Sequence, residues 1–369
     1  MNLSDASTNK AVRRAAAHRG AGGNPPNRFD EFHIEPDAGW DPEQDPLPRT
    51  QFLKDHSGTI ISYNDSPDIP FETSLNPYRG CEHGCVYCYA RPTHEYLGFS
   101  AGLDFETRIM VKEDAPKLLR AELSSPRWKP KVISLSGVTD PYQPIERRLK
   151  LTRACLEVLA EFRNPVTVVT KNNLVMRDLD FLSELARHHA AAVFISVTTL
   201  DGKLRNIMEP RTTPLRGRLT AIHALAEAGV PVGVMVAPII PGLTDHEIPS
   251  IVEAARNSGA EFACHEILRL PLAVAPLFEQ WLLIHLPQQK ERVLNRIRTM
   301  RGGKLNDPRF GVRMRGEGIF AEQISGMFRT ICRRVGLVEE SPELSVEAFR
   351  RSRGRQMELG LSGSGSHGE

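Results

Sequence analysis

The sequence predicts an α/β fold, a partial (β/α)6 TIM-like barrel with a helical C-terminal extension and a largely irregular N-terminal segment. Apolar runs rich in Val and Ile alternate with segments of helical period through the middle of the 369 residues. The alternation ends near residue 275, and the first 65 residues are rich in Gly, Pro, Asn, Asp and charge. Strand–helix alternation predicts a parallel sheet with right-handed crossovers. About six units are too few for an eight-stranded barrel, so we expect an open barrel with its site at the C-terminal ends of the strands.

The expected strands are short runs of apolar and β-branched residues. Near-continuous runs of this kind are typical of strands that are buried on both faces, as in a parallel sheet covered by helices. The six expected strands lie at residues 71–77, 131–140, 166–172, 191–200, 231–242 and 260–270.

The helices between these strands are expected from apolar stripes at helical spacing. One stripe covers residues 151–162, and another covers 215–225 and is followed by Gly229, an expected C-cap. The segment 244-TDHE-247 is typical of a capping box. In such a box the Thr hydroxyl and the Glu carboxylate accept from the first N–H groups of the following helix.

Composition and pattern divide the chain into four parts. Little of the first part can bury apolar area, and the sequence GLSGSGSHGE at the end is typical of a flexible tail. Helices are expected at 276–301 and 318–336. The four parts are a partly disordered N-terminal extension at 1–65, the barrel core at 66–275, a helical extension at 276–340 and a flexible tail at 341–369.

Bulk charge does not point to a nucleic-acid or membrane partner, because the net charge is only +2. Basic residues nevertheless gather near both ends of the chain and between Arg292 and Arg315. They are either solubilising charge or a surface for a polyanion. No apolar stretch is long enough to span a bilayer, and the N-terminus lacks the apolar region of a secretory signal, so we expect a cytoplasmic protein.

Three of the six cysteines, Cys81, Cys85 and Cys88, fall within eight residues in the segment 77-PYRGCEHGCVYCYARPTHEY-96. The segment follows the first expected strand, which places it on a loop at the catalytic face. Three thiolates from one loop can hold three irons of a 4Fe–4S cubane and leave the fourth iron without a protein ligand. Gly80 and Gly84 permit the tight backbone wrapping that three ligands on one cluster require.

A structural zinc site is the alternative interpretation of these cysteines. Zinc takes four ligands, and His83 or His94 could supply the fourth. Zinc ribbons and fingers usually bring their ligands from two separate elements, however, and no second Cys or His pair has a matching spacing. The predicted barrel further favours the iron–sulfur cluster.

The Cys-x3-Cys-x2-Cys motif with an aromatic residue before its last cysteine resembles the radical S-adenosylmethionine (SAM) superfamily. The wider sequence resembles its spore photoproduct lyase-related branch, the DNA repair photolyase-like radical proteins. This resemblance covers about residues 70–272. It implies a barrel of the radical SAM type, in which the methionyl amine and carboxylate of SAM chelate the fourth iron. The matching segments are SLNPYRGCEHGCVYCYAR, SGVTDPYQPIE, VVTKN, FISVTTL, the EPR within residues 208–211, and VAPIIPGLTD.

The resemblance also implies roles for single residues around SAM. Tyr87 occupies the aromatic position beside the adenine. Thr139 and Asp140 match the acidic stretch that holds the methionyl amine, although Asp before Pro is also common turn chemistry. Lys171 matches the lysine that pairs with the methionyl carboxylate. Ser196 is expected near the carboxylate or the ribose, and Thr198 on the same strand face competes with it for that role.

Other polar residues near the expected barrel mouth are not assigned to the binding of SAM. Glu209 and Arg211 are interpreted as an ion pair. In the sixth strand, alternation places Cys264 and Glu266 on one face and His265 and Arg269 on the other, and one of these faces must line the lumen.

The scattered cysteines receive a different interpretation. Cys155 and Cys332 fall on apolar helical stripes and are expected in the core. Cys264 is the remaining candidate for a hydrogen-atom donor. True spore photoproduct lyases use an additional cysteine near the substrate, and this sequence has no counterpart in matching context.

The sequence thus predicts a radical SAM enzyme that binds a 4Fe–4S cluster and cleaves SAM to a 5′-deoxyadenosyl radical for hydrogen abstraction. It would need a reducing partner such as a flavodoxin-type protein. The substrate is a nucleic acid, a peptide or a small metabolite. The alternative function is a zinc-stabilised nucleic-acid-binding module without radical chemistry.

Overall fold

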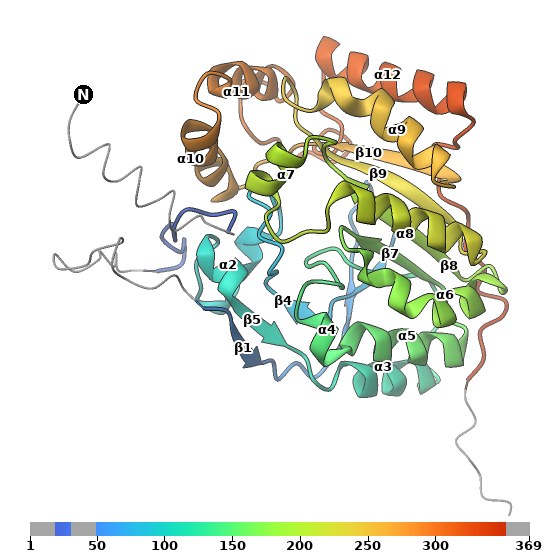
Figure 1. Ribbon diagram of the computed structural model, residues 1–369. Helices are drawn as coiled ribbons and strands as arrows, with labels where there is room; N and C mark the ends of the chain where they lie inside the picture. Colours follow the sequence, from blue (N-terminus) through green and yellow to red (C-terminus); the bar gives the residue numbers. More distant parts are fainter. Residues whose placement is uncertain (1–18, 31–48, 352–369) are drawn as a thin grey trace, which may run out of the picture.

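The computed structural model describes residues 19–30 and 49–351. A seven-stranded sheet in the order β10-β9-β8-β7-β6-β3-β2 forms its centre (Figure 1). The strands from β3 to β10 in this sheet are parallel, and β2 pairs antiparallel with β3 at one edge. The strands are β2 (Ile61–Tyr63), β3 (Thr73–Leu75), β6 (Ile133–Leu135), β7 (Val166–Thr170), β8 (Ala191–Val197), β9 (Val232–Ile239) and β10 (Phe262–Ile267).

These six parallel strands are the six that the sequence predicts, so the partial barrel is confirmed. Their apolar side chains are buried: helices cover the outer face of the sheet, and the inner face points into the barrel. Five helices that follow strands cover the outer face (Figure 1), and α12 packs on α9. These helices are α3 (Ala115–Ser124), α5 (Leu151–Phe162), α6 (Leu179–Ala186), α8 (Leu215–Glu227) and α9 (Ile248–Asn257).

Short helical segments connect these elements and lie near the mouth of the barrel or at its rim. Cys155 on α5 is fully buried, as predicted. Gly229 follows α8 with a φ of +70°, the left-handed conformation expected after a helix. The connecting segments are η1 (Arg91–Leu97), α2 (Leu103–Thr107), α4 (Glu146–Leu149), η2 (Asn173–Asp178), α7 (Gly202–Met208) and η3 (Asp245–Glu247).

The predicted capping box at residues 244–247 is wrong. The Thr244 hydroxyl turns back and accepts a hydrogen bond from the N–H of Ile240. The Glu247 carboxylate accepts from the Thr199 hydroxyl and the Leu200 N–H instead of from its own helix. A tertiary contact with the end of β8 therefore takes the carboxylate that local sequence assigns to the cap.

The C-terminal extension is helical, but residues 276–301 form two helices and not one. Here α10 (Val274–His285) ends two residues before Pro287, and α11 (Lys290–Thr299) begins after it. Proline lacks the N–H that a continuing helix needs. The last helix, α12 (Ile319–Val335), ends at Gly336 in the left-handed conformation and buries Cys332, as predicted.

A second sheet was not predicted from the sequence. It contains β1 (Gln51–Lys54), β5 (Arg108–Val111) and β4 (Tyr78–Arg79), in the order β1-β5-β4. Residues 19–30 also lie against the protein, so the described parts of the N-terminal extension are integrated into the fold. The remaining residues of the extension lie outside the described residues.

The first part of the predicted tail also contacts the barrel. The Phe349 ring lies 6.3 Å from that of Phe162, and the Arg350 N–H donates to the Phe162 carbonyl. Residues 352–369 lie outside the described part. Among the described residues, every helix is too short or too polar to cross a membrane.

Candidate active site

The loop that carries Cys81, Cys85 and Cys88, hereafter the cysteine loop, follows β4 at the mouth of the barrel. Gly80 and Gly84 have φ values of +78° and +67°, so the backbone turns in the left-handed region at both glycines. Both glycines therefore make the tight turns that the sequence predicts at the two ends of this stretch. All three thiols are free, with Cys81 and Cys85 buried and Cys88 half-buried.

The donor set of this loop fits an iron–sulfur cubane. Burial raises the pKa of all three thiols above the ordinary cysteine value, so a metal cluster would have to displace their protons. In the part of the chain that the structure describes, no three His, Cys, Asp or Glu side chains are grouped around a site for a single metal ion. A cubane needs no such group, because each thiolate takes a different iron.

The segment Met208–Arg211 clamps the cysteine loop from the barrel side. The Val86 N–H donates to the Met208 carbonyl over 3.1 Å. Arg211 forms an ion pair with Glu82 on the loop, at 3.0 Å. The predicted pair between Glu209 and Arg211 is therefore wrong, because the backbone points their side chains at different partners.

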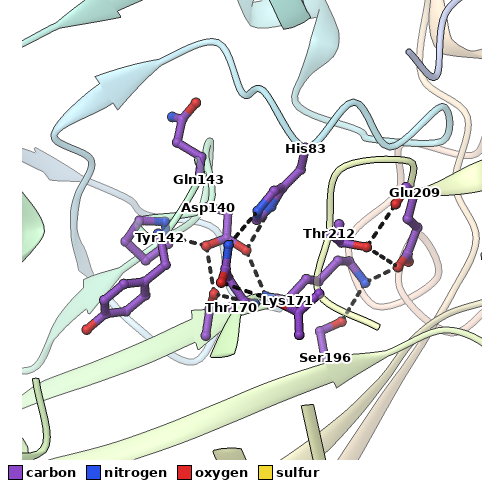
Figure 2. A network of polar contacts seen from close by, with 12 residues as sticks. His83, Asp140, Tyr142, Gln143, Thr170, Lys171, Ser196, Glu209 and Thr212 are labelled. Carbon is purple, nitrogen blue, oxygen red and sulfur yellow. Dashed lines mark hydrogen bonds and ion pairs between the residues drawn. The ribbon is translucent and has the colours of Figure 1, made fainter. Parts of the chain in front are cut away.

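Lys171 lies at the C-terminal end of β7, where its ammonium meets groups from two neighbouring strands (Figure 2). It donates to the Ser196 and Thr198 hydroxyls over 2.8 and 3.0 Å. It also donates to the Ala237 carbonyl over 3.0 Å. Ser196 and Thr198 both contact this ammonium, so the geometry does not favour either of the two competing hydroxyls.

Glu209 is the carboxylate of this site, and sequence reasoning missed its role. It lies 3.2 Å from the Lys171 ammonium, pairs with the buried Arg218 on α8, and accepts a hydrogen bond from the Tyr87 hydroxyl. Burial acts to raise the pKa of Glu209, but the charges of Arg218 and Lys171 hold it well below the ordinary value. Two cations thus face one buried carboxylate at this site.

Tyr87 connects the cysteine loop to this network. Its side chain is buried, and the Lys171 ammonium lies 5.7 Å from its ring centre. Its hydroxyl also lies 3.1 Å from that of Thr198. One residue of the loop therefore contacts the charged cluster of Lys171, Glu209 and Arg218 directly.

Protein donors occupy both carboxylate oxygens of Asp140 (Figure 2). One oxygen accepts from the Tyr142 N–H and the Thr170 hydroxyl, at 2.9 and 2.7 Å. The other accepts from the Lys171 N–H at 2.7 Å and lies 3.2 Å from His83 Nδ1. A carboxylate has about four acceptor positions, and these four donors fill them. Of the two interpretations that the sequence allows, the contacts favour the turn.

The polar groups of Thr139, like those of Asp140, are occupied by contacts within the protein. Its N–H and hydroxyl lie 3.2 and 3.4 Å from the Asn76 side-chain oxygen. These contacts join the loop after β6 to the loop after β3. Thr139 is therefore turned toward a neighbouring loop.

The sixth strand places Cys264 and Glu266 on the lumen side. The His265 ring packs on Phe328 of α12, at 4.3 Å between ring centres, so the opposite face of β10 must point inward. Burial raises the pKa of the Glu266 carboxyl and of the Cys264 thiol. A half-buried thiol beside a carboxyl thus lines the lumen.

Arg269 does not share the outer face with His265, contrary to the predicted alternation. Its guanidinium lies 4.0 Å from the ring centre of Tyr89, the residue after the last cysteine of the motif. The reason is that β10 has an irregular register between His265 and Ile267 and ends at Ile267. A period of two does not extend past an irregularity of this kind.

Comparison with known proteins identifies sequences similar to the part of the chain that contains this site. A model of the radical SAM superfamily matches residues 75–255. An uncharacterized protein of Mycobacterium tuberculosis is 41% identical over 177 residues, 48% of this chain and 52% of its own length. Spore photoproduct lyase of Bacillus subtilis is 30% identical over 178 residues, 46% of this chain and 45% of its own length. The chain therefore spans about half the length of these curated relatives.

A solved structure shares the fold. Spore photoproduct lyase complexed with dinucleoside spore photoproduct has a TM-score of 0.56 to this chain. The similarity covers 78% of this chain and 81% of that chain, at 18% sequence identity. At this identity the likeness shows the fold alone.

Proposed function

Because the chain belongs to the radical SAM superfamily and is related to spore photoproduct lyase, we propose that it binds a 4Fe–4S cluster through Cys81, Cys85 and Cys88 and cleaves SAM reductively. The observation that carries this proposal is the placement of three thiols from one loop beside the buried charged cluster of Lys171, Glu209 and Arg218. When bound, the cluster supplies the electron that cleaves the SAM sulfonium to methionine and a 5′-deoxyadenosyl radical.

Lys171 is the residue of the pocket that would bind the methionyl carboxylate. Its ammonium is held by Ser196, Thr198 and the Ala237 carbonyl at the ends of neighbouring strands. These three contacts occupy the N–H donors of the ammonium, which also lies 3.2 Å from Glu209, so the methionyl carboxylate would have to replace one of these contacts. A preplaced cation of this kind would orient the ligand.

Asp140 and Thr139 would act on SAM indirectly. The Asp140 carboxylate fixes the backbone N–H of Lys171, and Thr139 fixes the loop that faces the cysteines. We assign them to positioning the pocket, since their polar atoms are occupied by the protein. Tyr87 would form the wall of the pocket beside the adenine, with its hydroxyl anchored on Glu209.

The substrate would enter the lumen between the cysteine loop and β10. Tyr89, Arg269, Glu266 and Cys264 line this side, and Cys264 is the candidate that could donate a hydrogen atom. The relative solved with a dinucleoside spore photoproduct makes nucleic acid the first substrate class to test. Binding of DNA or RNA that weakens steeply with salt would support it, and no binding at low salt would exclude it.

A reducing protein of the flavodoxin type would deliver the electron. Transfer of electrons from a purified flavodoxin to the loaded protein is the direct check, and no transfer would exclude this class of donor.

Metal analysis after anaerobic reconstitution tests the cluster. We expect about four irons and four sulfides per chain, as for other cubanes. Cys88→Ala should lose most of both, because it removes one of three thiolates. Cys332→Val is the matched control, since Cys332 is buried on α12 away from the loop, and it should load like the unmodified chain. One bound zinc without sulfide would contradict the cluster and support the zinc module.

A further inference from the structure

The described N-terminal segment, residues 19–30, lies beside α2 (Figure 1) and contacts the cysteine loop at Gly84. The Leu103 N–H donates to the Gly23 carbonyl, and the Ser100 hydroxyl donates to the Pro25 carbonyl. Asn27 closes the segment at its far end, donating to the Glu95 and Phe99 carbonyls over 2.9 and 3.1 Å. We call residues 20–27 the N-terminal strap.

Glu106 joins the strap to the loop region. Its carboxylate accepts from the N–H groups of Gly20 and Ala21 over 3.0 and 2.8 Å. The same carboxylate pairs with Arg91, and both side chains are fully buried. A buried charged pair is stable only if its remaining hydrogen-bonding positions are filled, and the strap N–H groups fill two of them.

Arg91 links Glu106 to the cysteine loop. Its Nε donates to the Cys85 carbonyl over 3.0 Å, and its Nη1 donates to the Ala101 and Gly102 carbonyls. The backbone at Cys85 is thus tied through Arg91 and Glu106 to Gly20 and Ala21. A chain of buried hydrogen bonds connects the strap to one of the three expected iron ligands.

The strap also lies directly against the loop backbone. A Cβ atom on Gly20 would lie 1.6 Å from the Gly84 carbonyl oxygen and 3.1 Å from the Val86 nitrogen. No side chain larger than hydrogen fits there without moving the strap. Gly20 therefore sets how closely the strap covers the stretch between Cys81 and Cys85.

We propose that the N-terminal strap is a positioning element of the cysteine loop, which holds Cys85 in place and closes the outer side of the loop to solvent and oxygen. Its role at the cluster rests on the function proposed above. Because the strap precedes the barrel in sequence, the cluster site consists of more than the barrel core that carries the motif. Exposure to solvent governs the access of oxidants to a cluster and tunes its potential.

The pair Gly20→Ala and Gly23→Ala tests the strap. Both add one methyl group, but a Cβ on Gly23 meets no atom within 4 Å. In the apo protein, Gly20→Ala should speed alkylation of Cys85 by iodoacetamide about tenfold or more, because labelling of a buried thiol requires local opening. In the reconstituted protein it should shorten the lifetime of the cluster absorbance in air by a similar factor. Gly23→Ala should match the unmodified chain in both.

Cys155, fully buried in the core, reports on folding in the same experiment, since it should stay unlabelled in every variant. Asn27→Ala, which releases the far end of the strap, should speed Cys85 labelling in the same direction. Labelling of Cys85 at the unmodified rate in Gly20→Ala and Asn27→Ala would overturn the inference. Faster labelling in a chain that binds no iron would uphold the positioning role and contradict the proposed function.

Discussion

Glu209 connects the two cations of the charged cluster, Lys171 and Arg218. It is fully buried, and it is the carboxylate that contacts both Lys171 and Arg218. Removing one partner of a buried pair leaves an uncompensated charge, which costs about 3–5 kcal/mol. We therefore expect Glu209→Gln to lower the free energy of unfolding of the apo protein in urea by about that amount.

A matched control is Glu227→Gln, because Glu227 pairs with His223 on the exposed face of α8. Its free energy of unfolding should stay within about 0.5 kcal/mol of the unmodified chain.

The variants Glu209→Gln and Glu227→Gln also test how the stability depends on pH. Since the pKa of Glu209 is held below its ordinary value, its stabilisation is complete above that value, 4.5, and is lost as the pH falls below it. Stability below this pH should fall less steeply in Glu209→Gln, and an equal slope would contradict the ion pairs.

Single residues differ in how far the sequence could reveal them. Cys81, Cys85 and Cys88 share one loop, so spacing alone suggests their chemistry. Glu209 could not be found in this way, because its partners lie on β7 and α8 and meet it only after folding. The available signal was the EPR segment that contains Glu209, which matches the resembling family but does not by itself give the residue a role.

Elements were predicted best where apolar periodicity is long. Five of the six parallel strands follow from apolar, β-branched runs, which are typical of strands that are buried on both faces. Helix ends were predicted less well. At residues 244–247 the local pattern of a capping box was overridden by the contact of Glu247 with the end of β8. The small sheet of β1, β4 and β5 gave no pattern, because its strands have only two to four residues.

Gly233 on β9 makes a close contact between neighbouring strands possible. It pairs with Phe194 on β8 and Phe262 on β10, whose rings meet edge to face at 5.0 Å. A Cβ on Gly233 would lie 2.1 Å from the Phe262 ring. Gly233→Ala should lower the free energy of unfolding by about 1–3 kcal/mol, the usual cost of overpacking.

Gly202→Ala is the control for this substitution. Gly202 begins α7, and a Cβ there meets no atom within 4 Å. Alanine at a helix position without a clash is neutral or slightly stabilising. If both alanine variants unfold at the same urea concentration as the unmodified chain, the strand spacing described here is wrong.

At the scale of the molecule, the composition of the terminal regions did not indicate how much of them would pack against the barrel. Several basic residues are committed to internal contacts rather than to a polyanion surface. Arg350 and Arg351 donate to backbone carbonyls of the barrel, and Arg313 in the basic run pairs with Asp68. The N-terminal strap could not be predicted either, because glycine-rich sequence is equally compatible with disorder.

Reductive cleavage of SAM by the anaerobically reconstituted full chain tests the proposed enzyme most directly. With dithionite as the electron source, we expect 5′-deoxyadenosine and methionine to form together, and neither to form with Cys88→Ala. Addition of SAM should also change the electron paramagnetic resonance spectrum of the reduced cluster. A chain that carries iron and sulfide but yields no 5′-deoxyadenosine would contradict the proposed radical chemistry.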